Sequence, residues 1–163
     1  MKVTVLGVGE LGVDDTPGAV IKTFALGSCV AVMVYDLKLK VAGMVHVALP
    51  DSSIKPARAA SLPGYFADTG VATLFRLMAR FRSGMSGTRG LTVKLAGGAS
   101  IMATHAGFNI GKRNTEAALS HLSALGLTPM SMQVGGSISR TVSIEVDTGR
   151  IVLSSPGRSD SVI

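Results

Sequence analysis

Short valine-rich runs separated by glycine or charged breaks dominate the first part of the chain. These runs cover residues 2–6, 19–26, 29–35 and 41–49, and each has a length typical of a β-strand. The last three follow one another closely, with only short glycine-rich or polar breaks between them. We therefore expect these three strands to be antiparallel neighbours in one sheet.

Helical spacing of apolar residues follows in the middle of the chain. Within residues 67–81 the apolar positions recur at steps of three and four, namely Ala67, Val71, Leu74, Phe75, Met78 and Phe81. A second helix is predicted from about Asn114, as its N-cap, to a C-terminal Gly126. Residues 50–64 contain three prolines and show no periodicity, so we expect a mobile surface loop there.

The remaining apolar runs predict strands again. They cover residues 91–96, 130–134, 140–146 and 150–153, and the last two form a hairpin around Asp147-Thr148-Gly149. Strands and helices do not alternate regularly along the chain. The order predicts an α/β fold, a layered sandwich with largely antiparallel or mixed sheets and two main helices.

Composition narrows the class of protein. The chain has 163 residues, so we expect a single domain over residues 1–163. Hydrophobic residues make up 47% of the chain and charged residues 16%, which excludes an intrinsically disordered protein. Cys29 is the only cysteine, which excludes an internal disulfide and a zinc site built from several thiolates.

The sequence contains no pattern typical of a membrane span. The longest run without Asp, Glu, Lys or Arg covers residues 117–139, but His121, Pro129 and Gly135-Gly136 interrupt it. A helix that crosses a bilayer needs roughly 20 predominantly apolar residues. The N-terminal residues lack a signal-peptide pattern, so we expect a cytoplasmic protein with a reduced Cys29 thiol.

A glycine motif near the N-terminus allows two interpretations. Gly7-Val8-Gly9-Glu10-Leu11-Gly12 matches G-x-G-x-x-G after a predicted strand, as in dinucleotide-binding proteins. Such a site needs a helix that begins at the third glycine and binds the pyrophosphate. Residues 14–18, Asp-Asp-Thr-Pro-Gly, would break that helix, and the two carboxylates would repel a phosphate. The motif therefore favours a turn.

The three histidines are His46, His105 and His121, and none lies at a metal-ligand spacing from another. We expect His121 to be a surface or boundary residue of a helix, and the place of His105 stays open. His46 lies within an apolar strand, where burying an imidazole without a partner costs free energy.

Cys29 and His46 form the pair with the clearest chemical potential. If the strands that carry them are neighbours, the thiol and the imidazole can approach, and a nearby histidine activates a thiol and supplies a general acid and base. The alternative is that Cys29 is a small buried hydrophobic residue and His46 a satisfied core histidine. The two residues by themselves do not decide between these interpretations.

Longer segments around this pair resemble a known family. Thr23 is followed by Gly27-Ser28-Cys29, and then His46 begins a His-x(3)-Pro-Asp-Ser pattern. In this order the segments strongly resemble the CheD family of chemoreceptor glutamine deamidases. The likeness continues over nearly the whole chain, in residues 65–69, 94–99, 109–114 and 135–136.

The resemblance implies a cysteine hydrolase that needs no cofactor and no metal. In this reading Cys29 is the nucleophile, His46 is the acid and base, and Thr23 orients His46. Backbone amides near Gly27, Ser28 or Cys29 are the expected oxyanion donors. The family fold resembles that of the deamidating cytotoxic necrotizing factor toxins.

The resemblance also implies partners. The substrate would be the cytoplasmic helical domain of a chemoreceptor, a CheC-type phosphatase would regulate the enzyme, and residues 50–64 would form a flap or rim of the binding surface. We expect a monomer with no membrane insertion. The alternative function is a non-catalytic regulatory module that binds receptors or the CheC-type partner.

Net charge gives one further alternative. Lys and Arg number 16 against 10 for Asp and Glu, a formal charge of +6. With two tyrosines, no tryptophan and dispersed basic residues, the chain lacks the stacking platform and basic helix of a nucleic-acid-binding protein. We expect no nucleic-acid partner, and a diffuse attraction toward acidic receptor bundles instead.

Overall fold

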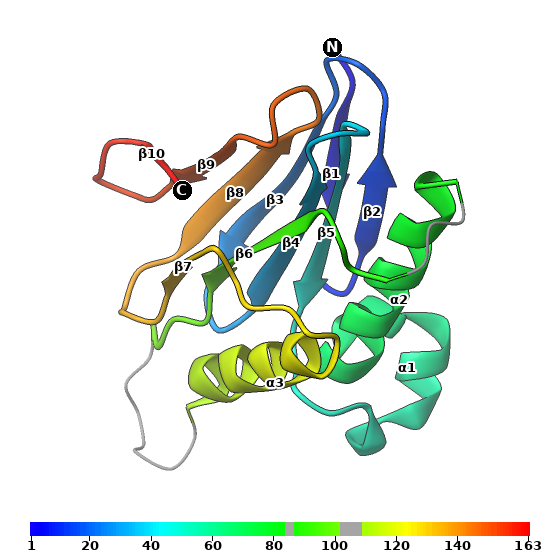
Figure 1. The fold of residues 1–163 in the computed structure, drawn as a ribbon. Helices are drawn as coiled ribbons and strands as arrows, with labels where there is room; N and C mark the ends of the chain where they lie inside the picture. Colours follow the sequence, from blue (N-terminus) through cyan, green and yellow to red (C-terminus); the bar gives the residue numbers. More distant parts are fainter. Residues whose placement is uncertain (84–86, 102–108) are drawn as a thin grey trace.

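Residues 1–83, 87–101 and 109–163, which the computed structural model describes, form two five-stranded sheets and three α-helices in layers (Figure 1). Sheet A has the strand order β1 (Val3–Leu6), β3 (Val20–Leu26), β8 (Arg140–Glu145), β9 (Ile151–Ser154) and β10 (Ser161–Val162). Sheet B has the order β2 (Leu11–Asp14), β5 (Val41–Val47), β4 (Val30–Asp36), β6 (Leu91–Gly97) and β7 (Ser131–Val134).

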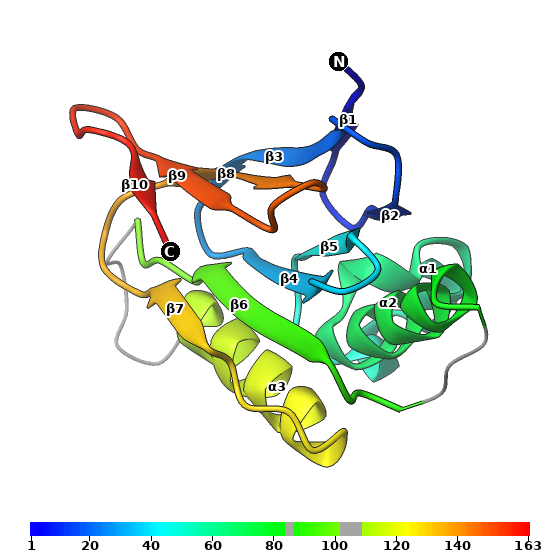
Figure 2. The same ribbon diagram turned by 45° about the horizontal axis from the view of Figure 1, so that its top comes forward.

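Both sheets are mixed. The β1–β3 and β6–β7 pairs are parallel, and the other strand pairs are antiparallel. Helices α2 (Ala67–Phe81) and α3 (Ile110–Ala124) cover the face of sheet B that points away from sheet A, as Figure 2 shows. The predicted layered α/β fold with mixed sheets is therefore confirmed.

Sheet B is the middle layer, between sheet A and the helices, because its central strands are apolar on both faces. Every residue of β4 and β5 is buried. In β4, Val30, Val32 and Val34 pack against the helices, whereas Ala31 and Met33 pack against sheet A. A strand buried on both sides shows a continuous apolar run rather than alternation.

One strand pairing differs from the prediction. β4 and β5 are antiparallel neighbours as expected, but β3 belongs to the other sheet, and the chain crosses between the sheets through residues 27–29. β3 has exposed and buried residues along its length, because the outer face of sheet A is open to solvent. β3 thus belongs in an outer sheet, and β4 in the middle one.

Residues 50–64 are not the irregular loop that was predicted. They form a 3-10 turn at Ser52–Ile54, helix α1 at Pro56–Ser61 and a second turn at Pro63–Tyr65. Pro56 and Pro63 occupy first helical positions, where the missing N–H costs nothing and the fixed φ favours the helix. Two of the three prolines that suggested a loop therefore begin helical turns.

The second long helix begins five residues earlier than predicted. Its N-cap is Asn109, whose side chain accepts a hydrogen bond from Lys112 N–H at 3.0 Å, and Asn114 lies inside the helix. The predicted C-terminal Gly126 is confirmed, with a left-handed φ of 75°.

The remaining predictions mostly agree with the structure. α2 spans the predicted 67–81, and the hairpin of β8 and β9 is confirmed. The short strands β2 and β10 were missed. None of the described helices is long and apolar enough to span a membrane.

Candidate active site

Two polar side chains meet inside the apolar core between the sheets. Thr23 comes from β3 of sheet A, and His46 comes from β5 of sheet B. Their exposed fractions are 0% and 3%. Thr23 Oγ1 lies 2.7 Å from His46 Nδ1 and 2.8 Å from the carbonyl oxygen of Leu6. The hydroxyl therefore links the two sheets through the imidazole.

These contacts assign the tautomer of His46. The Leu6 carbonyl can only accept, so the single hydroxyl proton of Thr23 is donated to it. Thr23 Oγ1 must then accept from His46 Nδ1–H, which leaves Nε2 with its lone pair. Nε2 is buried, and no partner for it is found among the described residues. The nitrogen that a general base needs is thus available.

Cys29 lies on the same face of sheet B as His46. Ala31 is directly opposite His46 in the β4–β5 ladder, and Cys29 comes two residues before Ala31. The half-buried Cys29 packs against the same inter-sheet cluster as Ala31. Residues diagonal across a ladder are about 7–8 Å apart. Within the described residues no hydrogen bond joins the thiol to Nε2.

Burial governs the protonation of both groups. It raises the pKa of the Cys29 thiol above its usual value and lowers the pKa of His46 to about 4. Desolvation disfavours the thiolate and the imidazolium alike. At neutral pH the free protein therefore holds a thiol and a neutral imidazole rather than an ion pair.

A bulge in β3 directs the chain from Thr23 to Cys29. The β3–β8 register shifts between Thr23 and Leu26, and Ala25 has a φ of 54°, a left-handed value that alanine rarely adopts. Ala25 N–H donates to Thr141 Oγ1 at 3.2 Å, which compensates for part of the lost ladder. Bulges re-aim side chains beside functional sites, and this one lies between two candidate site residues.

The crossover residues after the bulge carry backbone N–H groups that are candidate oxyanion donors. The carbonyls of Gly27 and Cys29 each accept a hydrogen bond at 2.8 Å, from Ala99 and Gly98 respectively. In the part of the chain that the structure describes, the N–H groups of Gly27 and Ser28 have no recorded partner. Both residues line a groove of about 370 Å³. Gly27 and Ser28, the predicted oxyanion donors, therefore lie at this groove.

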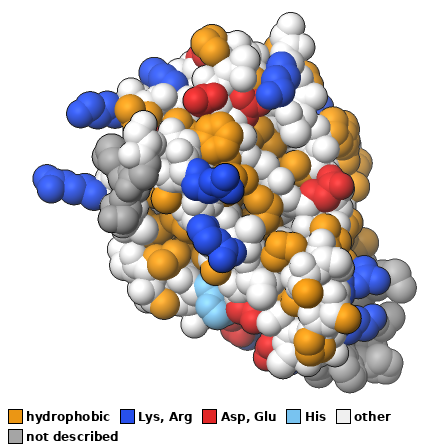
Figure 3. All heavy atoms as spheres, turned by 90° about the vertical axis from the view of Figure 1, so that its right-hand side faces the viewer, with side chains coloured by type: hydrophobic (Ala, Val, Ile, Leu, Met, Phe, Trp, Pro, Cys, Tyr) orange, Lys and Arg blue, Asp and Glu red, His pale blue; other side chains and the backbone are white. Residues whose placement is uncertain are grey.

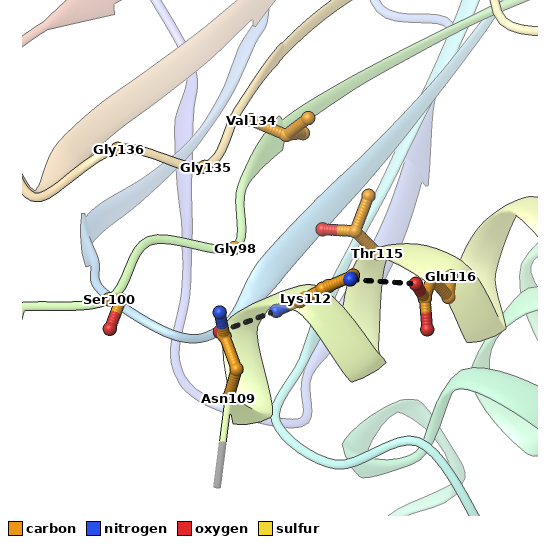
Figure 4. A pocket seen from close by; sticks show the side chains of 9 residues that line it. All are labelled: Gly98, Ser100, Asn109, Lys112, Thr115, Glu116, Val134, Gly135 and Gly136. Carbon is orange, nitrogen blue, oxygen red and sulfur yellow. Dashed lines mark hydrogen bonds and ion pairs between the residues drawn. The ribbon is translucent and has the colours of Figure 1, made fainter. Parts of the chain in front are cut away.

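This groove continues into a second cavity of about 260 Å³, between α3 and the ends of β6 and β7 (Figure 4). Ser100 and Asn109 line both. In Figure 4, Lys112 extends along α3 toward Glu116, and their charged atoms are 3.9 Å apart. The two cavities therefore adjoin each other, and the first is lined by Ser28, the residue before Cys29.

Asn114 was missed as a site residue. It is fully buried in α3, and its Nδ2 donates at 2.9 Å to the carbonyls of both Ser28 and Ala48. It thus connects the residue before Cys29 to the strand end after His46. Asn114, Ala118 and Leu122 are four residues apart and all buried. With the helix start at residue 110, this spacing would place Asn114 on the inward face of the helix.

The structure tests two of the other candidates from the sequence, the glycine motif and His121. The glycine motif is a turn, as predicted: Gly9 has a φ of 82°, and strand β2 rather than a helix follows. His121 is half-buried near the end of α3, as expected of a boundary residue. His105 lies outside the described residues. No cluster of three metal-ligating side chains occurs among the residues that could be searched.

These groups can together perform nucleophilic hydrolysis. They are the Cys29 thiol, the His46 imidazole whose Nδ1 is held by a hydroxyl, and the backbone N–H groups of the crossover. Comparison with known proteins agrees with this class. The model of the family described as CheD chemotactic sensory transduction matches residues 48–155. The chain belongs to the CheD family.

Several curated relatives match almost end to end. The probable chemoreceptor glutamine deamidase CheD of Syntrophotalea carbinolica is 54% identical over 94% of both chains. Probable chemoreceptor glutamine deamidase CheD 2 of Anaeromyxobacter dehalogenans is 43% identical, over 95% of this chain and 96% of that protein. The chemoreceptor glutamine deamidase CheD of Thermotoga maritima is 39% identical, over 94% of this chain and 92% of the relative.

Proposed function

We propose that this protein is a chemoreceptor glutamine deamidase, a protein-glutamine glutaminase that converts receptor glutamines to glutamates and releases ammonia. The names of the relatives support this activity. The observation that carries the chemistry is the hydrogen bond between Thr23 and His46, which frees Nε2 on the face of sheet B that bears Cys29.

The first half-reaction forms a thioester. As the glutamine carboxamide enters the groove, His46 Nε2 takes the thiol proton and Cys29 Sγ bonds to the amide carbon. The N–H groups of Gly27 and Ser28 stabilise the oxyanion. The imidazolium then protonates the amide nitrogen, the C–N bond breaks and ammonia leaves. The thiol–imidazole bond tightens only when substrate excludes water, as often occurs in catalytic pairs.

The second half-reaction hydrolyses the thioester. His46 Nε2 takes a proton from a water molecule, whose oxygen bonds to the thioester carbon. The C–S bond breaks, the glutamate side chain forms, and the proton on His46 returns to the Cys29 sulfur. Thr23 orients the imidazole in both steps, but a neutral hydroxyl stabilises its charge less than a carboxylate would. Because the imidazolium is stabilised less, we expect the enzyme to be slow.

The two adjoining cavities provide the docking surface for a helical receptor substrate. The segment 50–64 adds a rim to this docking surface on the side of α3 where Pro50 and Asp51 share a separate hollow with Arg113. A CheC-type phosphatase regulates the enzyme by competing for the same face. In this proposal residues 1–163 are a single domain that works as a monomer in the cytoplasm, with a fold like that of the cytotoxic necrotizing factor deamidases.

The test is incubation of the full chain with cytoplasmic fragments of receptors from the same organism. Peptide mass spectrometry should show specific Gln-to-Glu conversions together with ammonia release. Cys29→Ala and His46→Ala should abolish both signals, whereas His121→Ala, a matched histidine substitution on α3, should retain them. Receptor binding without any conversion would instead support the non-catalytic regulatory module.

A further inference from the structure

A buried arginine outside the active site lacks a counter-charge. Arg140, the first residue of β8, is only 8% exposed. Its Nη1 donates to the Gly97 carbonyl at 3.2 Å, and within the described residues no carboxylate lies within ion-pair distance of it. A guanidinium has five N–H donors and remains charged, and buried charges are normally paired. The other guanidinium nitrogens of Arg140 are not among the buried polar atoms without a partner in the described residues, so they are open to solvent, where an anion can reach them.

A second arginine increases the local positive charge. Burial and the charge of Arg158, in the loop between β9 and β10, together lower the pKa of Arg140. Asp160 lies in the same loop, but no ion pair joins it to either arginine in the described residues. Two like charges held together without an anion raise the free energy of the folded state.

Both arginines line one small cavity. Its volume is about 100 Å³, and polar side chains from Gln133, Ser155, Ser159 and Ser161 line it together with Arg140 and Arg158. No carboxylate is among its lining residues. A cavity of this size is large enough to hold ordered water or one small tetrahedral oxyanion.

We propose that this cavity binds a phosphate-class oxyanion, either inorganic phosphate or the phosphoryl group of a small molecule or side chain. Arginine presents N–H groups in a planar fork that matches phosphate oxygens, and serine hydroxyls donate to the remaining ones. Two guanidiniums and three hydroxyls supply more donors than the two oxygens of a carboxylate can accept. The donor set therefore favours a tetrahedral anion.

The site adjoins the strand ends that position the nucleophile. Arg140 lies opposite Leu26, just before the crossover, and its carbonyl partner Gly97 pairs with Val30 of β4. The next residue, Gly98, donates to the Cys29 carbonyl at 2.8 Å. An anion that orders Arg140 would thus also stabilise the backbone on both sides of Cys29. Anion binding itself does not depend on the deamidase reaction.

The test measures phosphate binding to the full chain by isothermal titration calorimetry and by thermal unfolding. Sodium phosphate is compared with sodium chloride and sodium acetate at equal ionic strength. We expect phosphate alone to raise the unfolding temperature, since a ligand that binds only the folded state stabilises it. Equal midpoints in all three salts would overturn the proposal.

Variants separate the site from general charge effects. Arg158 is exposed, so Arg158→Gln should fold normally and weaken phosphate binding at least about tenfold, as expected for a lost charge-assisted hydrogen bond. Arg76→Gln removes the same charge from an exposed position on α2 and should bind phosphate like the parent. Equal weakening in both variants, or in neither, would contradict the site.

A final arm identifies the source of the phosphoryl group. Phosphoserine replaces inorganic phosphate in the same titration. Tighter binding of inorganic phosphate supports a free anion as the occupant, and tighter binding of phosphoserine supports a phosphorylated side chain. Failure of both to bind would overturn the proposal even if the deamidase activity is intact.

Discussion

At the scale of single residues, Thr23 determines what His46 can do. The Thr23 hydroxyl has a single proton, which it donates to the Leu6 carbonyl, so the imidazole must donate from Nδ1 to Thr23 Oγ1. The sequence suggested Thr23 only through the family resemblance. No local pattern reveals that residues 23 and 46 meet, because they lie in different sheets.

Replacing the Thr23 hydroxyl tests this role. Thr23→Val has a similar shape but cannot accept from Nδ1, so the tautomer is no longer held. We expect kcat for deamidation to fall about 5- to 150-fold, the equivalent of about 1–3 kcal/mol for an unmet buried hydrogen bond. Thr23→Ser retains the hydroxyl and should recover most of the rate. An unchanged kcat in Thr23→Val would contradict the role.

The raised pKa of Cys29 predicts the pH dependence of its alkylation. Thiolate reacts with iodoacetamide and thiol does not. Because burial raises the pKa of Cys29, its thiolate fraction should still increase up to and beyond pH 9. The alkylation rate, followed by mass spectrometry without substrate, should therefore climb steadily from neutral to alkaline pH. A plateau near neutrality would reveal a preformed thiolate–imidazolium pair instead.

At the scale of elements, α3 does more than cover a sheet. Its first half brings Asn114 to the ends of two strands, where the β4–β5 ladder has stopped at Val30 and Val47. The two hydrogen bonds of Asn114, to Ser28 and Ala48, hold the two chain segments together beyond the last backbone pair of the ladder. The helix was predicted from periodicity, but its start was misplaced because Asn109 and Asn114 have the same capping chemistry.

Asn114→Ala removes both of these hydrogen bonds. We expect an unfolding free energy lower by about 1–3 kcal/mol and a lower kcat with little change in KM. Ala118→Gly, a buried position on the same helix, costs about 1 kcal/mol through helix propensity and should leave kcat unchanged. Equal losses of kcat in the two variants would assign Asn114 a purely structural role.

A buried ion pair joins α2 to sheet B. Arg82 Nε lies 2.7 Å from Asp36 Oδ2, and its other nitrogens donate to the carbonyls of Gly87 and Arg89. Hydrogen bonds from Leu39 N–H and Arg82 outweigh burial and lower the pKa of Asp36.

Removing one partner leaves a buried charge alone. Arg82→Ala should lower the unfolding free energy by about 3–5 kcal/mol, measured by urea denaturation at neutral pH. The double variant Asp36→Leu/Arg82→Leu should recover part of this loss, because no unpaired charge remains. A single variant as stable as the parent would show that the pair contributes nothing.

At the scale of the whole molecule, the site lies where three layers converge. Sheet A supplies Thr23, sheet B supplies Cys29 and His46, and α3 supplies Asn114. On the face with α1 and α2, Lys and Arg side chains are interspersed with Asp and Glu (Figure 3). This face has no continuous basic patch, which agrees with a diffuse rather than a local positive field.

That field should influence encounter with an acidic receptor. A net charge of +6 predicts that kcat/KM for receptor fragments falls as salt rises from about 50 to 300 mM, because the Debye length shortens to less than 10 Å. The value of kcat at saturating substrate should stay constant. A kcat/KM that does not change with salt would show that electrostatic attraction does not contribute to receptor binding.

The sequence by itself determined the features that depend on near neighbours. Periods of two and 3.6 residues located most strands and both long helices, and the lone cysteine and the histidine in an apolar strand identified the candidate chemistry. Only the tertiary structure decided which sheet each strand joins and that Asn114 and Arg140 lie where they do. These outcomes depend on contacts between residues far apart in the chain, which no local window contains.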